Sequence, residues 1–330
     1  MSTATAPAEP GATVLIVDNA GTRYPLTEIA SGSYRSDSLL LDPARQYQLR
    51  LTTRANTTYA SDLVPLKVTP PIDKLAWVQQ GNYLAVRLST HDAQQQSRYY
   101  RWSFNETWEF NSAYQSFLEY RGGIIQSRIT PIYTCWRTEQ NTLIKQGSSA
   151  QLSQDALTDQ PILNIPNRAE RIKIRYSVLV SQYAETAQEF AYYDLLRKNT
   201  EAVGTVNDPL PTQLTGNVHR VDNASEPVLG YVGAHTVQRQ RLFINRQDLP
   251  FPTGWQFDTP YQACTLGQED LSEYKPPLSF PNTVLFSTPG NIPTTTISDP
   301  VTGQFIGYAG SSRECVDCRL RGSNVKPSFW

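Results

Sequence analysis

The residues of this chain whose types and spacing best suit chemistry are its four cysteines: Cys135, Cys264, Cys315 and Cys318. The Cys-x-x-Cys spacing of the last two fits tetrahedral sulfur ligation of zinc. A strong zinc motif would add a second such pair or two spaced histidines, and the sequence has neither. A redox dithiol needs a Cys-x-x-Cys that opens a helix after a strand, whereas Arg319-Leu-Arg-Gly follows here. We therefore expect structural disulfides, formed in an oxidising compartment, and no metal site.

The pairing of these cysteines does not follow from the sequence, because four cysteines allow three connectivities. We favour the arrangement in which Cys315 and Cys318 each reach a distant partner, Cys135 or Cys264. Each bond would then close a long loop and, in the chain-entropy model, would contribute on the order of 4 kcal/mol. Such bonds would staple the last part of the chain to the body of the protein.

An aromatic pair, Phe329 and Trp330, closes the sequence. Chain ends are normally disordered unless something holds them in place. The nearby cysteines and the aromatic pair would supply that hold, so we expect a packed tail. Removal of residues 328–330 is then expected to destabilise the fold.

Other catalytic constellations are sparse. The sequence holds no His-Glu-x-x-His motif, no Gly-x-Ser-x-Gly elbow and no phosphate-binding glycine loop. A glycosidase needs two carboxyl groups about 5 to 10 Å apart across a cleft. Glu106 and Glu109 would lie on opposite faces of a strand, although acids that meet only in the fold, such as Glu106 with Asp194, stay open. We expect a protein that is not an enzyme and uses no cofactor.

Composition narrows the function classes further. The 330 residues include 29 Lys and Arg against 30 Asp and Glu, so the chain lacks the basic excess that nucleic-acid binding requires. Its 23 prolines and 18 tyrosines favour many short strands and few long helices. No apolar run is long enough to span a membrane, and the first residues do not form a signal peptide. Either the protein is cytosolic or this chain lacks its original leader. The four cysteines favour the second alternative.

The N-terminal region predicts a small β-sandwich over residues 11–70, preceded by a disordered segment at 1–10. A β-branched run at 12–18 and a second predicted strand at 22–28 flank an Asn-Ala-Gly turn and indicate a hairpin. The pair Pro70-Pro71 cannot continue a central strand, so we place a domain boundary there.

Residues 71–330 predict a larger β-rich domain of fibronectin or immunoglobulin-like type, and the fold as a whole is expected to be mainly β. The clearest strand is 171–182, which passes from alternating to continuously apolar, as a strand does on entering a core. A Thr-x-x-Glu capping box at Thr186 then opens one helix over 187–199. Residues 248–299, rich in proline and polar side chains, indicate a long wrapping segment or a mobile loop.

Aromatic side chains are the weak candidates for ligand binding. Tyr100, Trp102 and Phe104 share one face of a strand, which would suit a platform for sugars or for a partner's side chains. Aromatic rows at strand spacing more often belong to a core, and we expect that outcome here. The tryptophans that could stack on a sugar are Trp77, Trp102, Trp108 and Trp255.

Several short motifs, taken in order, carry a family resemblance. They are Tyr99-Tyr-Arg-Trp-Ser-Phe-Asn-Glu-Thr-Trp108, Cys135-Trp136, Arg175-Tyr-Ser-Val-Leu-Val-Ser-Gln182, Asn199-Thr-Glu-Ala-Val-Gly204, Gly216-Asn217, Val228-Leu-Gly-Tyr231, Cys315-Val-Asp-Cys-Arg319 and Lys326-Pro-Ser-Phe-Trp330. Together they make the chain resemble the domain of unknown function 4249 family over nearly its whole length, most specifically from Tyr99 onward.

The resemblance implies a predicted outer-membrane lipoprotein of Gram-negative bacteria, often encoded beside TonB-dependent receptors. The implied role is a non-catalytic accessory or substrate-capturing partner of such a receptor, lipid-anchored on the periplasmic or outer side. Two departures stand out: this chain has no lipid-bearing cysteine after a signal peptide, and His219 or Arg220 stands where members often carry a cysteine. The alternatives are a stand-alone adhesion or glycan- or peptide-binding module and, third, a hydrolase.

Overall fold

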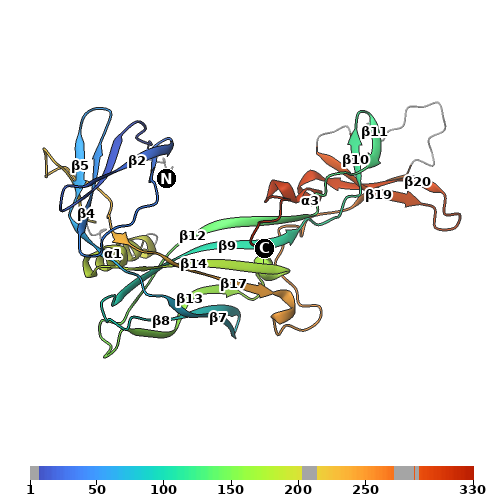
Figure 1. The fold of residues 1–330 in the computed structure, drawn as a ribbon. Helices are drawn as coiled ribbons and strands as arrows, with labels where there is room; N and C mark the ends of the chain where they lie inside the picture. Colours follow the sequence, from blue (N-terminus) through green and yellow to red (C-terminus); the bar gives the residue numbers. More distant parts are fainter. Residues whose placement is uncertain (1–6, 203–213, 271–285, 287–289) are drawn as a thin grey trace.

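The computed structural model describes residues 7–202, 214–270, 286 and 290–330. The fold is mainly β, as the composition and the strand patterns predicted. A central sandwich carries a separate sheet at one end and a projecting arm at the other (Figure 1). Among the helices of the described residues, none combines the length and the apolar character needed to cross a bilayer.

The sheet at the N-terminal end is eight-stranded, and its main path runs β15-β5-β4-β1-β2-β3. Its strands are β1 (Thr13–Asp18), β2 (Arg23–Ala30), β3 (Ser33–Ser36), β4 (Gln46–Thr52), β5 (Thr58–Ser61), β6 (Val64–Lys67), β15 (Val218–Arg220) and β16 (Ala234–His235). The predicted hairpin is present, with β1 antiparallel to β2. Strands β15 and β16 come from the region that the sequence placed in the second domain, and they pair with β5 and β6.

The predicted disorder of residues 1–10 is wrong for its last part. The backbone carbonyl of Glu9 accepts a hydrogen bond from the Tyr34 hydroxyl at 2.9 Å, and the Glu9 carboxylate accepts one from the Arg54 amide at 3.2 Å. These bonds tie the segment to the first sheet. Residues 1–6 lie outside the described residues.

Two antiparallel sheets form the central sandwich, in the orders β12-β9-β14-β17 and β13-β8-β7. Their strands are β7 (Ile72–Gln80), β8 (Tyr83–His91), β9 (Tyr99–Asn111), β12 (Thr134–Ser148), β13 (Ala156–Pro166), β14 (Arg175–Ala184) and β17 (Gln238–Asn245). The inner faces alternate with period two, so that Leu84, Val86, Trp102, Phe104 and Val180 are all buried in one core. This core fixes the position of everything attached to the sandwich.

Helix α1 spans Ala187–Ala202 and lies beside the sandwich, beneath the N-terminal sheet (Figure 1). It begins where the capping box predicted and runs three residues beyond the expected end. The Thr186 hydroxyl accepts a hydrogen bond from the Glu189 amide at 3.1 Å, which is half of the expected box. The Glu189 side chain does not complete it, because it turns toward the sandwich.

The arm consists of a three-stranded sheet, β18-β20-β19, and a hairpin beside it. Its elements are β10 (Leu118–Arg121), β11 (Ile124–Ser127), β18 (Gly267–Asp270), β19 (Asn291–Ser298), β20 (Phe305–Ser312) and α3 (Arg313–Val316). Short 3₁₀ turns lie at Glu170–Ile172, Arg246–Asp248 and Cys318–Leu320. The expected wrapping segment 248–299 instead supplies β18 and β19 to this arm, which extends away from the sandwich (Figure 1). Residues 271–285 and 287–289 of that segment lie outside the described residues.

Candidate functional site

The structure removes two of the tryptophan candidates. Trp102 and Trp108 are 1% and 6% exposed, because both point into the sandwich from β9. Trp102 donates its indole N–H to Gln182 at 2.9 Å, as a buried indole usually must. Neither ring is therefore open to a sugar, and the burial agrees with the core position that the sequence analysis expected for the row containing Trp102.

Trp77 and Trp255 are half-buried and do not form a shared platform. Trp77, on β7, packs against the core of the sandwich. Trp255 stacks on Phe251, with ring centroids 4.7 Å apart, and donates its N–H to the Asn167 carbonyl at 3.1 Å. Each ring is already committed to the protein, so neither offers two free faces to a ligand.

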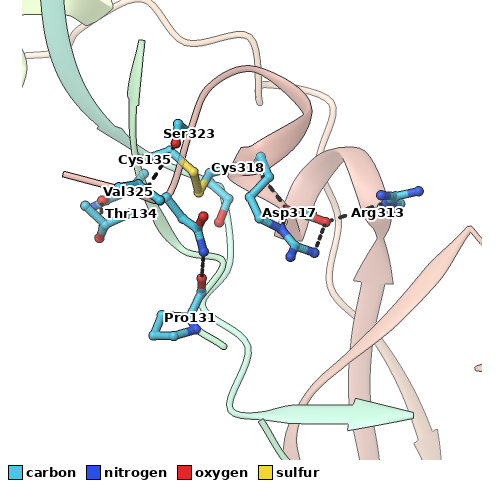
Figure 2. Close-up of a disulfide and its surroundings, with 12 residues drawn as sticks. Pro131, Thr134, Cys135, Arg313, Asp317, Cys318, Ser323 and Val325 are labelled. Atoms are coloured by element: carbon cyan, nitrogen blue, oxygen red, sulfur yellow. Dashed lines mark hydrogen bonds and ion pairs between the residues drawn. A yellow bond between two sulfur atoms is a disulfide. The ribbon is translucent and has the colours of Figure 1, made fainter. Parts of the chain in front are cut away.

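The four cysteines form two disulfides, Cys135–Cys318 and Cys264–Cys315, each with Cα atoms 5.7 Å apart. The first joins β12 to the segment that follows α3 (Figure 2). The second joins Cys315 of α3 to Cys264, in the stretch that precedes β18. Both reach distant partners from the Cys-x-x-Cys pair, which leaves no thiol among the four for metal or redox chemistry.

Hydrogen bonds extend the effect of the first disulfide. The backbones of Trp136 and Ser323 exchange two hydrogen bonds of 2.8 and 2.9 Å, so that the segment after the disulfide continues the edge of β12. Asp317, buried next to Cys318, accepts hydrogen bonds from Arg319 and lies 3.6 Å from Arg313 (Figure 2). Burial would raise the pKa of Asp317, but these arginine contacts outweigh it and the pKa is lowered.

The closing aromatic pair lies on the sandwich. Trp330 meets Phe243 edge to face, with centroids 5.8 Å apart, and donates its N–H to Glu109 at 3.2 Å. Phe329 lies over the Arg241 guanidinium, 3.6 Å from its carbon, while staying 41% exposed. The segment is thus held by specific contacts, with Trp330 the better anchored of the two rings.

The carboxylates considered for a hydrolase serve the fold. Glu106 is 3% exposed, and its oxygens accept hydrogen bonds from Tyr176 at 2.6 Å, Arg171 at 2.7 Å and Asn141 at 2.8 Å. Asp194 instead forms ion pairs on its own helix with Arg197 and Lys198. Glu106 and Asp194, whose meeting the sequence left open, instead have separate partners and do not form a carboxylate pair. Within the described residues, no cluster of His, Cys, Asp and Glu has the makings of a metal site.

A crevice opens between helix α1 and the N-terminal sheet, with a volume of about 500 Å³. Its aromatic wall is formed by Tyr192 on α1 and Tyr231, with ring centroids 5.2 Å apart and planes tilted by 39°. The β5–β6 connection contributes Asp62 and Leu63 to the crevice, and β6 contributes Pro65. The remaining lining residues are Val64, Thr186, Gln188, Ala191, Leu195, Thr215, Gly216 and Asn217.

Local hydrogen bonds fix the shape of this crevice. The Asn217 side chain donates to the Val232 carbonyl at 2.9 Å and accepts from the Val232 amide at 2.8 Å, like one more rung of a β-ladder. The Asn217 carbonyl in turn accepts the Asp62 amide at 2.8 Å. Gly216 packs so close to Gly230 that a Cβ would lie 1.7 Å from its carbonyl oxygen, so no larger residue fits there.

A buried ionic cluster holds α1 against the sandwich beside the crevice. Arg101, on β9, lies between the rings of Tyr183 and Tyr193 and donates to Glu185 at 2.5 Å. It also lies 3.8 Å from Glu189 of α1. Both glutamates are almost fully buried. Burial would lower the pKa of Arg101, but the two carboxylates raise it, so the guanidinium stays charged.

Proton occupancy in the cluster is set mainly by burial. Burial, reinforced by the neighbouring Glu185, raises the pKa of Glu189 to about 8, and burial raises the pKa of Glu185 as well. His235, from β16, lies 3.3 Å from Glu189, and burial lowers its pKa to about 4. At neutral pH the cluster therefore holds a neutral histidine beside a largely protonated Glu189. Each group has a partner inside the protein, so the cluster is suited to positioning α1 and β16, not to turning over a substrate.

Sequence reasoning did not assign these crevice and cluster residues to a site, although the family-like motifs include Gly216-Asn217, Tyr231 and Arg101. Tyr192 and Tyr231 follow no binding motif, and His235 was one of three scattered histidines. The Thr-x-x-Glu pattern did single out Glu189, but as a helix cap. His235 reaches α1 because β16 pairs with β6. Its place in the cluster could be predicted only from that strand pairing, which no local pattern in the sequence indicates.

Fold and site together define a β-rich, disulfide-stapled protein with a tyrosine-lined crevice. The chain belongs to the family described as domain of unknown function (DUF4249), whose model matches residues 1–241. The match ends before the arm's β18–β20 sheet and the cysteine pair at 315 and 318. None of the curated proteins matches the chain.

Among solved structures, the chain is similar to that of "a putative carbohydrate binding protein from Bacteroides uniformis". It is 9% identical, with a TM-score of 0.15, over 55% of this chain and 82% of that one. At that TM-score the two folds do not superpose well enough for the likeness to bear on fold or ligand.

Proposed function

We propose that this protein is a non-catalytic lipoprotein of the outer membrane that captures a ligand for, or otherwise assists, a TonB-dependent receptor. Membership of the DUF4249 family supports the receptor and the membrane, since the sequence resemblance implies both. The two disulfides suit a protein exported to an oxidising compartment. In this proposal the protein is held at the outer membrane by a lipid anchor.

The observation that carries the capturing role is the crevice between α1 and the N-terminal sheet. Its volume of about 500 Å³ lies within the range of small-ligand sites. It combines two tyrosine rings with amide, hydroxyl and carboxylate groups, so a ligand would find both apolar faces and hydrogen-bond partners. The buried cluster around Arg101 holds its walls without contributing reactive groups, which fits binding without turnover.

The test is an affinity purification of the full-length, lipidated protein from its own outer membrane, followed by mass spectrometry. We expect a TonB-dependent receptor in stable proportion to the bait. A bait carrying Tyr192→Ala and Tyr231→Ala should still recover the receptor but lose small ligands that copurify. Tyr120→Ala, on the hairpin of the arm, is the matched control. Recovery of the bait alone, with every variant, would sink the receptor partnership.

A stand-alone glycan- or peptide-binding module is the second candidate, and the paired tyrosine rings of the crevice favour it. In that case the purified protein would bind immobilised glycans or peptides without a receptor. Loss of that binding in Tyr192→Ala, but not in Tyr120→Ala, would place the ligand in the crevice.

A further inference from the structure

The outer face of the four-stranded sheet β12-β9-β14-β17 is the face turned away from the core. Odd-numbered residues of β9, β14 and β17 point to it, because their even-numbered neighbours Trp102, Val180 and Ile244 are buried inside. Helix α1 covers one end of this face near Arg101, and the Phe329-Trp330 pair covers the other. Strand β17 forms its edge, and within the described residues it hydrogen-bonds as a strand only to β14.

Arginines dominate the β17 side of this face. Arg239 and Arg241 stand two residues apart on β17, opposite Ser181 and Leu179 of β14. Arg175 lies opposite Asn245 on the same face. In the described part of the chain none of these three arginines takes part in an ion pair, although the whole chain is nearly neutral.

Aromatic rings, not carboxylates, hold two of these guanidinium groups. Arg175 lies over Phe243, 4.4 Å from its centroid, with Trp330 on another side at 5.1 Å. Arg241 lies over Phe329 and donates to Ser177 at 2.9 Å. A guanidinium stacked on a ring keeps donors free for an anion. Arg239 is exposed, and no aromatic ring in the described part of the chain lies over its guanidinium.

The carboxylate closest to these arginines in register is Glu109, the cross-strand neighbour of Arg175, and it accepts the Trp330 N–H. Around Arg241 the row across the sheet continues with Leu179, Asn105 and Gln140, which carry no charge. Around Arg239 and Arg241 the face is therefore cationic, and no carboxylate of the described residues forms an ion pair with either arginine, a condition that favours an acidic partner.

We propose that β17 is a docking edge for an extended acidic segment of a partner protein, which adds to the sheet as a strand with its carboxylates opposite Arg239 and Arg241. The two arginines are about 6.8 Å apart along the strand, the spacing of alternate side chains in any extended peptide. A Glu-x-Glu sequence therefore matches both at once: the carboxylate opposite Arg239 can form a bidentate contact, and the one opposite Arg241 meets the donors that Ser177 does not use. The free edge of β17 supplies backbone hydrogen bonds, the usual source of affinity in strand addition.

Other anionic partners fit this surface less well. A polysaccharide would need free aromatic faces to stack on, and Phe243, Phe329 and Trp330 are already engaged by guanidinium groups or by one another. A bilayer is broad and flat, whereas this edge lies between the N-terminal sheet and the arm at the two ends of the sandwich (Figure 1). The inference does not depend on whether the partner is a TonB-dependent receptor.

The test uses the full chain and a fluorescent peptide of alternating Thr and Glu, with binding read as fluorescence anisotropy at low salt. A Thr-Gln twin should bind at least about tenfold more weakly, because it lacks the charges. A twin with methylated backbone nitrogens on the edge-facing side should also lose binding, because it cannot add as a strand. Arg239→Glu should weaken the Thr-Glu peptide by about tenfold or more.

Arg35→Glu is the matched control, since Arg35 is an exposed arginine on β3, the edge of the N-terminal sheet. We expect it to leave binding unchanged, and circular dichroism would show that both variants are folded. Equal binding of the methylated peptide would overturn strand addition. Equal loss in both variants, or tighter binding of polygalacturonate or of anionic lipid vesicles than of the peptide, would overturn the acidic-segment partner.

Discussion

His235 lies with its Nε2 atom 3.3 Å from the Glu189 carboxyl, while its Nδ1 atom lies 3.0 Å from the carbonyl oxygen of Ala184. A carbonyl only accepts hydrogen bonds, so Nδ1 must carry the ring proton. In the neutral ring Nε2 is then an acceptor, and it needs a protonated Glu189 as donor. The raised pKa of Glu189 and the lowered pKa of His235 describe this same arrangement. Because β16 pairs with β6, the contact links α1 to the N-terminal sheet.

This pair predicts a pH dependence of stability. The His235 pKa is lowered from 6.5 to about 4, so its contribution is complete above pH 6.5 and is lost as the pH falls. The Glu189 pKa is raised from 4.5 to about 8, so its contribution is complete below pH 4.5 and is lost as the pH rises to 8. The two effects oppose each other up to pH 6.5. Between about pH 6.5 and 8 the Glu189 term is the one of this pair that still changes, and stability should fall.

The variant that isolates this term is Glu189→Gln, because its amide does not titrate and can donate to the neutral His235 throughout the range from pH 6.5 to 8. We expect it to reduce the fall between pH 6.5 and 8 by on the order of 2 kcal/mol, as measured by urea unfolding. A residual fall is expected, since the raised pKa of Glu185 acts in the same direction. Glu139→Gln, at an exposed position on β12, should change nothing. An unchanged slope in Glu189→Gln would show that Glu189 is ionised at neutral pH.

Some of this molecule was predictable from its sequence. The period-two row of Tyr100, Trp102 and Phe104 indicated a core strand, because alternate side chains must share a face. The Thr186 cap fixed the start of α1, because the first amides of a helix need a nearby acceptor. Both signals are local, so neither depends on the rest of the fold.

The contacts of Glu189, the strands of the arm and the crevice depend on segments that are distant in the sequence. Glu189 bonds His235 and Arg101 instead of capping its own helix, because β16 and β9 bring those partners to it. Strand β19 shows little alternation, since it belongs to a thin sheet with a small core, and its sequence therefore resembles a loop. The crevice is lined by segments near residues 62, 192, 217 and 231, and their spacing in the sequence does not predict that they lie close together.

Replacing Arg101 should lower the free energy of unfolding by several kcal/mol. The Arg101→Met variant would leave Glu185, which is fully buried, with only Gln146 as a side-chain donor. Breaking one partner of a buried ion pair typically costs about 3 to 5 kcal/mol. Arg137→Met is the matched control, because Arg137 pairs with Glu139 at the surface and should cost less than about 1 kcal/mol. Chemical denaturation of both variants at pH 7 measures the difference. Equal losses would mean that the Arg101 cluster is no stronger than a surface pair.

The two disulfides should differ in their contributions. Cys135–Cys318 spans 183 residues of sequence and Cys264–Cys315 spans 51. In the chain-entropy model, loops of these lengths correspond to about 5 and about 4 kcal/mol. We expect the double variant Cys135→Ser with Cys318→Ser to lower the melting temperature more than Cys264→Ser with Cys315→Ser, as read by calorimetry. The opposite order would place the greater stabilisation in the arm.

Trp330 should contribute measurably to stability through its contacts with β9, β14 and β17. Trp330→Ala would remove the edge-to-face contact with Phe243, the stacking on Arg175 and the hydrogen bond to Glu109. These losses together should cost about 2 kcal/mol, the usual scale for a partly buried aromatic side chain with one hydrogen bond. Val325→Ala, at a position that is 73% exposed on the same segment, should cost less than about 0.5 kcal/mol. If urea unfolding gave the same midpoint for Trp330→Ala as for Val325→Ala, the aromatic pair would lie on the sheet without stabilising it, and its contacts would be free to serve a partner instead.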